Sequence, residues 1–184
     1  NIQYEDSRQG GYPYALFDDE KMQAGEISYD KKSIYNRNLL SAGLNLNYSA
    51  QEFSVRAVSS FQSLDDFQEI DQDFTPQSLF FVDQNQQLHM LAQEINIESA
   101  KGSAYNWLFG TFGFKQLLDK AVTVKYGEDG LVQFKLPFSE YYYTKTYNNT
   151  NSGIAFFHQS TLDLGEFTLS AGIRADYEKA SLDY

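Results

Sequence analysis

The amino-acid sequence predicts an all-β chain whose antiparallel strands follow one another as an up-and-down meander. Three observations support this prediction. Apolar and polar residues alternate with a period of two over much of the chain, which is typical of strands with one face in an apolar environment. Tyr and Phe, which favour strands, number 14 and 15 among the 184 residues. The links between the predicted strands alternate between short and long along the chain.

The composition excludes several classes of protein. Asp and Glu number 25 against 14 Lys and Arg, so the net charge is −11; nucleic acid is therefore not an expected partner, because phosphate neutralisation supplies much of that affinity. There is no cysteine, which excludes a disulfide and a cysteine-based zinc site. No apolar run approaches the ~20 residues of a membrane helix. No cofactor is predicted.

The first third of the chain is expected to begin irregularly and then form strands. Residues 1–24 show no sustained alternation and are expected to be a loop or irregular. Strands are predicted within residues 25–62: a weak one over 25–30, then 38–48 and 53–61. Along 38–48, leucines at even positions alternate with Ser, Gly and Asn at odd positions.

Two hairpins follow. Residues 88–115 are expected to form the first, whose second strand is apolar on both faces and contains two glycines. Residues 153–178 are expected to form the second. The alternation predicts that one set of side chains shares a single outward face: Leu40, Leu44, Leu46, Phe53, Val55, Ile95, Ile97, Phe167, Leu169 and Ile173.

The links indicate which kind of meander this is. Short turns are predicted at 49–51, 100–103 and 164–166, and long loops at 63–87 and 116–152. In a meander this order places the short turns on one rim and the long loops on the other, as in outer-membrane barrels. We therefore predict a single segment, residues 1–184, of a large outer-membrane-type β-barrel with both long loops extracellular.

Aromatic residues gather near the short turns. Tyr48 and Phe53 flank the first turn, Tyr105 and Trp107 follow the second, and Phe167 follows the third. Rings at one level are typical of the aromatic girdle at a membrane interface. The alternative is that they fill the core of a sheet.

The two long loops contain the candidate ligand-binding residues. The first is acidic and aromatic, and the second is rich in tyrosine, whose rings stack on sugars or aromatic ligands. A solvated rim, or tyrosines that pack their own loop, is the simpler alternative. No metal site is predicted, because the glycine and closing glutamate of a calcium loop are missing. The candidates are Asp65, Asp66, Phe67, Glu69, Asp71, Asp73, Tyr141, Tyr142, Tyr143 and Tyr147.

No catalytic residues are predicted, and the chain is not expected to be an enzyme. There is no nucleophile elbow and no phosphate-binding glycine loop. His89 and His158 lie on separate strands and are expected to be structural or to face the barrel interior. Glu94 and Glu98 share a strand face, a spacing open to acid–base chemistry, although a polar barrel wall explains them more simply.

Five stretches in order resemble strand motifs of TonB-dependent outer-membrane receptors. The second and third resemble that family's Ser-Gln-Glu-Ile-Arg-Leu-x-Ser and Trp-x-x-Gly-x-Phe-x-Phe patterns. Ala92, Asn96 and Ala175 depart from the usual Ser, Arg and Tyr. The stretches are Val58-Ser-Ser-Phe-Gln-Ser63, Ala92-Gln-Glu-Ile-Asn-Ile-Glu-Ser99, Trp107-Leu-Phe-Gly-Thr-Phe-Gly-Phe114, Ile154-Ala-Phe-Phe-His-Gln-Ser160 and Leu169-Ser-Ala-Gly-Ile-Arg-Ala-Asp176.

This resemblance implies part of a 22-stranded barrel in the outer membrane of Gram-negative bacteria. Such receptors import scarce nutrients, such as ferric siderophores, and an inner-membrane energy-coupling protein drives them through a plug domain. The plug, its coupling box and the terminal aromatic strand have no counterpart among these residues, so no plug residue is carried over. We expect a central piece, about a third of a barrel, that self-associates through its edge strands or curls into a small sandwich or barrel.

Two other functions are compatible with the sequence. One is a secreted, soluble β-sandwich whose tyrosine-rich loop binds carbohydrate. The other is a β-rich hydrolase, for which no acid pair can be located. A plug domain upstream and a terminal Phe downstream in the parent gene would favour the receptor, whereas a signal peptide directly before Asn1 would favour the binding module.

Overall fold

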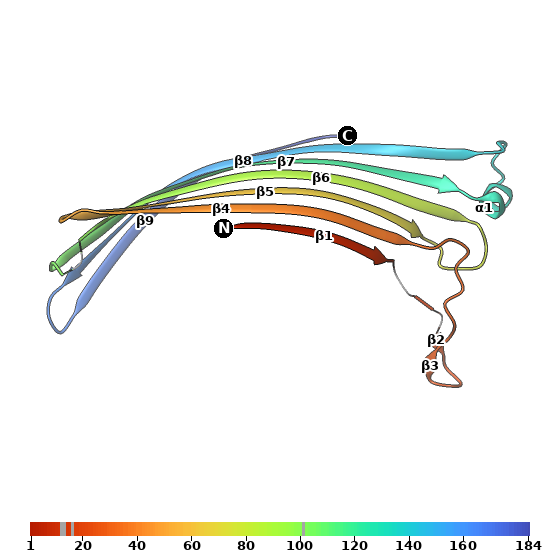
Figure 1. Cartoon of the computed structure of the whole chain (residues 1–184), viewed down its shortest axis with the longest axis horizontal. Helices are drawn as coiled ribbons and strands as arrows, with labels where there is room; N and C mark the ends of the chain where they lie inside the picture. Colours follow the sequence, from red (N-terminus) through yellow and green to blue (C-terminus); the bar gives the residue numbers. More distant parts are fainter. Residues whose placement is uncertain (12–13, 16, 101) are drawn as a thin grey trace.

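The computed structural model describes residues 1–11, 14–15, 17–100 and 102–184. Seven strands form one antiparallel sheet in which each strand pairs with the next along the chain, apart from the small hairpin between β1 and β4. The predicted all-β meander is confirmed (Figure 1). The strands are β1 (Ile2–Gly10), β4 (Ile34–Ser49), β5 (Phe53–Asp71), β6 (Phe80–Ser99), β7 (Tyr105–Tyr126), β8 (Tyr141–Asp163) and β9 (Thr168–Asp183).

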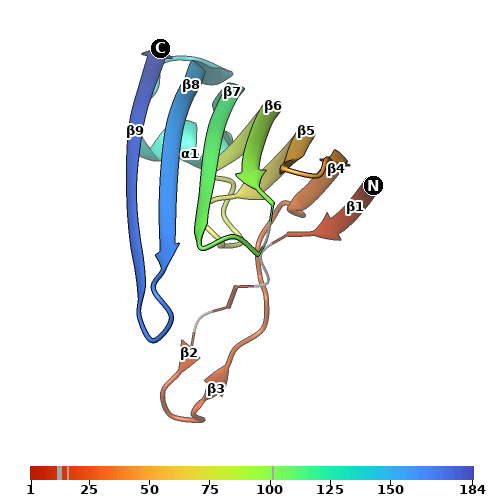
Figure 2. The ribbon, with the colours of Figure 1, turned by 90° about the vertical axis from the view of Figure 1, so that its left-hand side faces the viewer.

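The short and long connections lie at opposite ends of the strands. The turns β4–β5, β6–β7 and β8–β9 form one rim, which we call the short-turn rim (Figure 1). Gly102 and Gly165 take φ values of +107° and +88° in two of these turns, a conformation that favours glycine. The opposite rim, the long-connection rim, holds helix α1 (Glu128–Gln133) and leads to the small hairpin of β2 (Phe17–Asp18) and β3 (Gln23–Ala24) (Figure 2).

The strands are much longer than the sequence predicted. β5 to β8 contain 19, 20, 22 and 23 residues, so most of the expected loops 63–87 and 116–152 is strand. Only residues 72–79 and 127–140 connect these strands. The expected bounds were wrong because polar residues occur on both faces of the sheet here, and a clear period-two signal needs one face that is consistently apolar.

The start of the chain also differs from the prediction. Residues 2–10 were expected to be irregular, but they pair with β4 from Ile2 opposite Ala42 to Gly10 opposite Ile34. The weak strand expected over 25–30 is not present, since β3 ends at Ala24 and β4 begins at Ile34. The polar sequence of β1 hides its strand character for the same reason.

The register divides the side chains between two faces. Leu46, Ala57, Ile95 and Thr111 lie opposite one another on consecutive strands and share what we call face A. Their chain neighbours, such as Asn45 and Asn47, lie on the opposite face B. The predicted sharing of one face is confirmed for the nine of the ten apolar residues that lie in strands, because all nine fall on face A, whereas Phe167 lies in the turn just before β9.

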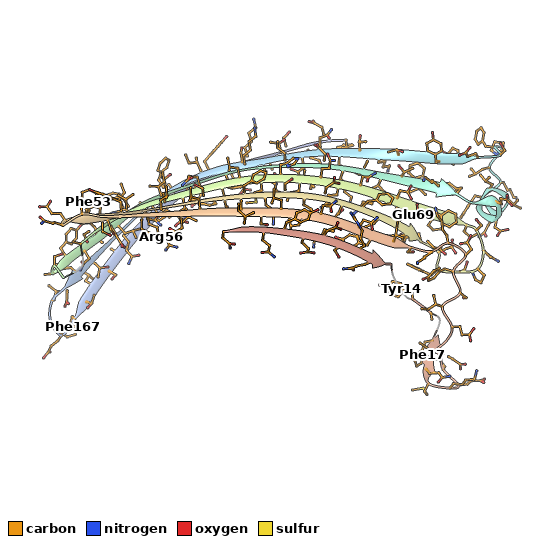
Figure 3. All side chains as sticks on the ribbon, viewed as in Figure 1. Tyr14, Phe17, Phe53, Arg56, Glu69 and Phe167 are labelled. Carbon is orange, nitrogen blue, oxygen red and sulfur yellow. The ribbon has the colours of Figure 1, made fainter. Side chains whose placement is uncertain are left out.

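The sheet forms a single layer with little core (Figures 2 and 3). Among the described residues only Leu64, Ala92 and Ala155 are buried hydrophobics. The sheet ends at β1 on one edge and β9 on the other, so the expected curling into a sandwich or small barrel does not occur. The alternative of a soluble β-sandwich also fails, because a sandwich needs two packed sheets. No helix in the described part of the chain is long and apolar enough to cross a membrane.

Candidate functional site

Exposed apolar side chains on face A form a band beside the short-turn rim. Leu44 and Leu46 are 55% and 58% exposed, and Ile173 is 73% exposed. Towards the long-connection rim the band gives way to a polar row that runs Asp65, Gln87, Asp119, Asn148. We define the apolar band by Leu40, Leu44, Leu46, Phe53, Val55, Phe61, Leu91, Ile95, Ile97, Phe109, Ile154, Phe156, Leu162, Leu169, Ile173 and Tyr177.

The predicted aromatic residues border this band. The rings of Tyr48 and Phe53 lie 6.2 Å apart, and those of Trp107 and Phe109 lie 5.5 Å apart. Phe167 is 74% exposed, and Phe53 and Phe167 lie at the same end of the sheet (Figure 3). Exposed rings do not fill a core, so the arrangement matches a girdle. From Leu40 to Tyr48 the strand rises roughly 27 Å, or about 21 Å of depth at a tilt of about 40°, comparable with the ~25 Å apolar band of barrels.

Polar side chains inside the band are satisfied within the sheet. The Ser59 hydroxyl donates to Gln93, whose amide donates to the carbonyl of Glu94 at 3.0 Å. His158 stacks on Phe109 with ring centroids 4.1 Å apart and lies 2.8 Å from the Ser160 hydroxyl. His89 and His158 both fall on face A, and each lies within hydrogen-bonding distance of a serine hydroxyl, Ser63 and Ser160, which fits the structural role expected for them.

Face B is polar on most of the same strands, although β7 presents Leu108, Phe112 and Phe114 there. Asn96 donates to Glu94 at 2.6 Å and Ser54 donates to Glu98 at 2.9 Å. The two carboxylates thus have separate partners and form no pair suited to acid–base chemistry. Phe157 lies over Gly110, where a Cβ would stand 2.0 Å from the ring.

The guanidinium of Arg174 covers the other side of this ring. It stacks 5.3 Å from the Phe157 centroid and binds Asp176 at 2.7 Å. Face B therefore presents charges that are already organised around a packed ring.

The sheet separates the acidic candidate residues. Asp65, Phe67 and Glu69 lie on face A, whereas Asp66 lies on face B. Asp71 is the last residue of β5 and Asp73 lies in the connection to β6. The sequence had placed all six in one loop, but consecutive residues of a strand point to opposite faces.

Asp66 belongs to a polar row on face B. Arg37, Asp66, Gln86, Lys120 and Tyr147 lie opposite one another on five consecutive strands, and we call them the inner row. Burial raises the pKa of the Asp66 carboxyl, which Arg37, Lys120 and a 3.4 Å hydrogen bond from the Tyr35 hydroxyl only partly offset. A groove of about 290 Å³ lies beside Lys120 and Tyr147.

Asp71 and Asp73 shape the connection that follows β5. The Phe74 amide donates to Asp71 at 3.3 Å, and Asp73 accepts hydrogen bonds from the amides of Thr75 and Phe80 at 3.0 and 3.3 Å. Burial raises the pKa of Asp71, and the nearby Asp73 raises it further. Through these hydrogen bonds the two carboxylates hold the fold of the connection. The described residues contain no group of three or more side chains that could hold a metal ion.

The candidate tyrosines also diverge. Tyr141, Tyr143 and Tyr147 lie on face B and Tyr142 on face A. The Tyr141 ring lies 5.5 Å from Tyr126 and 5.6 Å from Phe138. Two further rings adjoin Tyr126, and together we call these residues the rim aromatic cluster: Phe80, Tyr126, Phe134, Phe138 and Tyr141.

The sequence missed four members of this cluster. It also missed Arg37 and Lys120 of the inner row. Tyr126 at the end of β7 and Tyr141 at the start of β8 flank the connection 127–140. Aromatic residues placed in this way are the sequence signal that would have indicated the cluster.

The fold matches a known solved structure. The ferric yersiniabactin uptake receptor FyuA from Yersinia pestis superposes with a TM-score of 0.70 and 17% sequence identity, over 98% of this chain and 27% of that chain. The chain has the fold of a receptor-barrel segment. No family model and no curated protein matches the sequence.

An open, single-layer sheet is compatible with the wall of a large barrel. Such a wall needs no second layer packed on it, and the edges of a sheet are paired where a barrel closes. The chain spans about a quarter of the length of the receptor that it matches.

Proposed function

We propose that the chain is a wall segment of a TonB-dependent outer-membrane receptor that imports a scarce nutrient such as a ferric siderophore. The coincidence of two features supports this proposal. The fold of nearly the whole chain matches a segment of a receptor barrel, and most of the exposed apolar residues of the seven strands lie on face A, in the half of the sheet nearest the short turns.

The proposal gives the two faces and the two rims of the sheet an orientation in the outer membrane. The apolar band contacts lipid and face B lines the barrel interior. The short turns lie on the periplasmic side and the long-connection rim lies outside the cell, as in other outer-membrane barrels. The polar half of each strand extends the wall beyond the bilayer. Energy would reach the receptor from an inner-membrane coupling protein through a plug domain, for which no residue of this chain is proposed.

The proposed ligand-binding groups are those that face the interior. They comprise Asp66 and Tyr147 of the inner row, together with Tyr143 and the rim aromatic cluster. Asp65, Phe67, Glu69 and Tyr142 project from face A and are not included. Tyrosine rings beside charged groups suit a ligand that presents both aromatic and polar surface.

Lipid-quenching of single-cysteine variants tests the membrane orientation. The chain has no cysteine of its own, so a fluorophore is placed at Leu44, Asn45, Leu46 or Asn47 of the full-length protein in vesicles. Lipids with a nitroxide on the acyl chain should quench positions 44 and 46 and spare 45 and 47. Equal quenching at all four positions would refute the proposed orientation.

Uptake by adjacent tyrosine variants tests the ligand site. Tyr143→Ala should weaken nutrient uptake in cells, because its ring faces the interior. Tyr142→Ala is the matched control and should leave uptake unchanged, because its ring projects from face A. Loss of uptake in the second variant alone would contradict the assignment.

A further inference from the structure

Two lysines flank a serine at the outer edge of the apolar band. Lys115 on β7 and Lys179 on β9 both lie opposite Ser152 on β8. All three side chains share face A, and both lysines are exposed. Directly opposite Cβ atoms are about 5 Å apart, so the two lysine stems stand roughly 10 Å apart with the hydroxyl between them.

Among the residues that the structure describes, no acidic side chain lies beside this pair on face A. The next row towards the long-connection rim is Leu117, Thr150 and Ser181, and the next row towards the band is Gly113, Ile154 and Tyr177. Neither lysine belongs to an ion pair in the described part of the chain. The nearest carboxylates on face A of these strands, Asp119 and Asp183, lie two rows away, roughly 13 Å along the strands.

An apolar groove lies below the pair on the same three strands and on β6, which contributes Ile95 and Ile97. Its volume is about 450 Å³. It lies largely between Phe109, Phe156 and Ile173, and the small residues Thr111 and Ala175 lie between those bulky side chains. The strand rises roughly 20 Å from Lys115 to Phe109. Tilted by about 40°, this covers about 15 Å of depth, half of the ~30 Å hydrocarbon core.

We propose that this surface binds one phosphorylated lipid. The phosphate lies between the ammonium groups of Lys115 and Lys179 and accepts a hydrogen bond from the Ser152 hydroxyl. An acyl chain lies in the groove below. Charge-assisted hydrogen bonds to phosphate are stronger than neutral ones, and uncompensated ammonium groups beside hydrocarbon are costly. The inference depends on the proposed function, because face A must contact the bilayer.

Lipid binding to the full-length protein in neutral detergent tests the site. Phosphatidic acid, diacylglycerol with the same chains, and inorganic phosphate are each titrated, and the bound fraction is measured by native mass spectrometry. Phosphatidic acid should bind at least about tenfold more tightly than either other probe, because it alone engages both parts of the site. Lys115→Gln/Lys179→Gln should abolish this preference, and Lys115→Arg/Lys179→Arg should keep it.

Two controls separate the possible outcomes. Lys135→Gln/Lys145→Gln removes the same charge elsewhere and should bind like the wild type. Ala175→Phe fills the groove and should weaken phosphatidic acid and diacylglycerol alike. The proposal is wrong if Lys115→Gln/Lys179→Gln binds phosphatidic acid as tightly as the wild type, because the lysines would then only extend into water. It is also wrong if inorganic phosphate binds the wild type as tightly as phosphatidic acid does. If lipid quenching alternates at positions 44–47 but the lysine substitutions leave phosphatidic acid binding unchanged, only this inference fails. If lipid quenching does not alternate, the proposed membrane orientation fails as well.

Discussion

Leu44→Arg is the substitution that tests the lipid-facing band most directly. Leu44 lies on face A of β4, midway between Leu40 and Tyr48 at the two edges of the band, and is 55% exposed. Four residues on either side correspond to roughly 13 Å along the strand, so the side chain lies near the bilayer midplane. An arginine on the lipid face there costs about 2–4 kcal/mol, which reduces the folding equilibrium constant roughly 30- to 800-fold.

Asn45→Arg provides the matched control on the adjacent residue. Its side chain points to face B, where an arginine meets water in the barrel interior, and the expected change is within about 0.5 kcal/mol. Both variants of the full-length protein are folded into vesicles and unfolded with guanidinium, and their free energies of unfolding are compared. If Leu44→Arg costs no more than Asn45→Arg, face A does not contact lipid and the band needs another explanation.

Three further predictions concern other parts of the sheet. Gly110→Ala should destabilise the protein by about 1–3 kcal/mol in chaotrope unfolding, because the added Cβ meets the Phe157 ring. Gly43→Ala is the control and should change stability by less than about 0.5 kcal/mol, because its Cβ meets only one atom at 3.9 Å. Equal effects of the two substitutions would contradict this packing. Burial raises the pKa of Asp66 in the folded state above the ordinary value of 3.8. As pH falls between these two pKa values, the free energy of unfolding of the wild type should rise, because the native state binds the proton first. Asp66→Asn should lose that rise, and a variant with the same pH profile as the wild type would count against the burial of this carboxyl. The isolated 184-residue chain should self-associate through β1 and β9, so its mass by light scattering should rise with concentration, and a monomer at every concentration with unpaired edges would oppose this.

The apolar band could be predicted from the sequence because it depends on a local signal. Leu40, Leu44 and Leu46 alternate with polar residues, and that alternation fixes both the strand and its face. The sequence could not give the point at which each strand ends. β5 continues through Asp65 and Asp66 to Asp71, where polar residues occur on both faces and the alternation no longer distinguishes strand from loop.

The composition of the candidate site was harder to predict for a related reason. Asp65 and Asp66 are neighbours in sequence but lie on opposite faces, a separation that follows only once the strand is known to continue. The pairing of Asp66 with Arg37, Lys120 and Tyr147 depends on the register of five strands. Such non-local pairings leave no periodic trace in any one stretch of sequence.

The length of the strands changes what the candidate ligand-binding groups can do. Loops were expected to present them, but Asp66, Tyr143 and Tyr147 project from a continuous hydrogen-bonded ladder. Polar side chains also pair across the strands in the half of the sheet nearest the long-connection rim, as in the exposed 2.8 Å hydrogen bond between Thr123 and Thr144. Side chains on strands are held more firmly than side chains on loops and lose less freedom on binding. The inner row therefore fits a site whose geometry is set before the ligand arrives, and any closing movement is left to the connections at the rim.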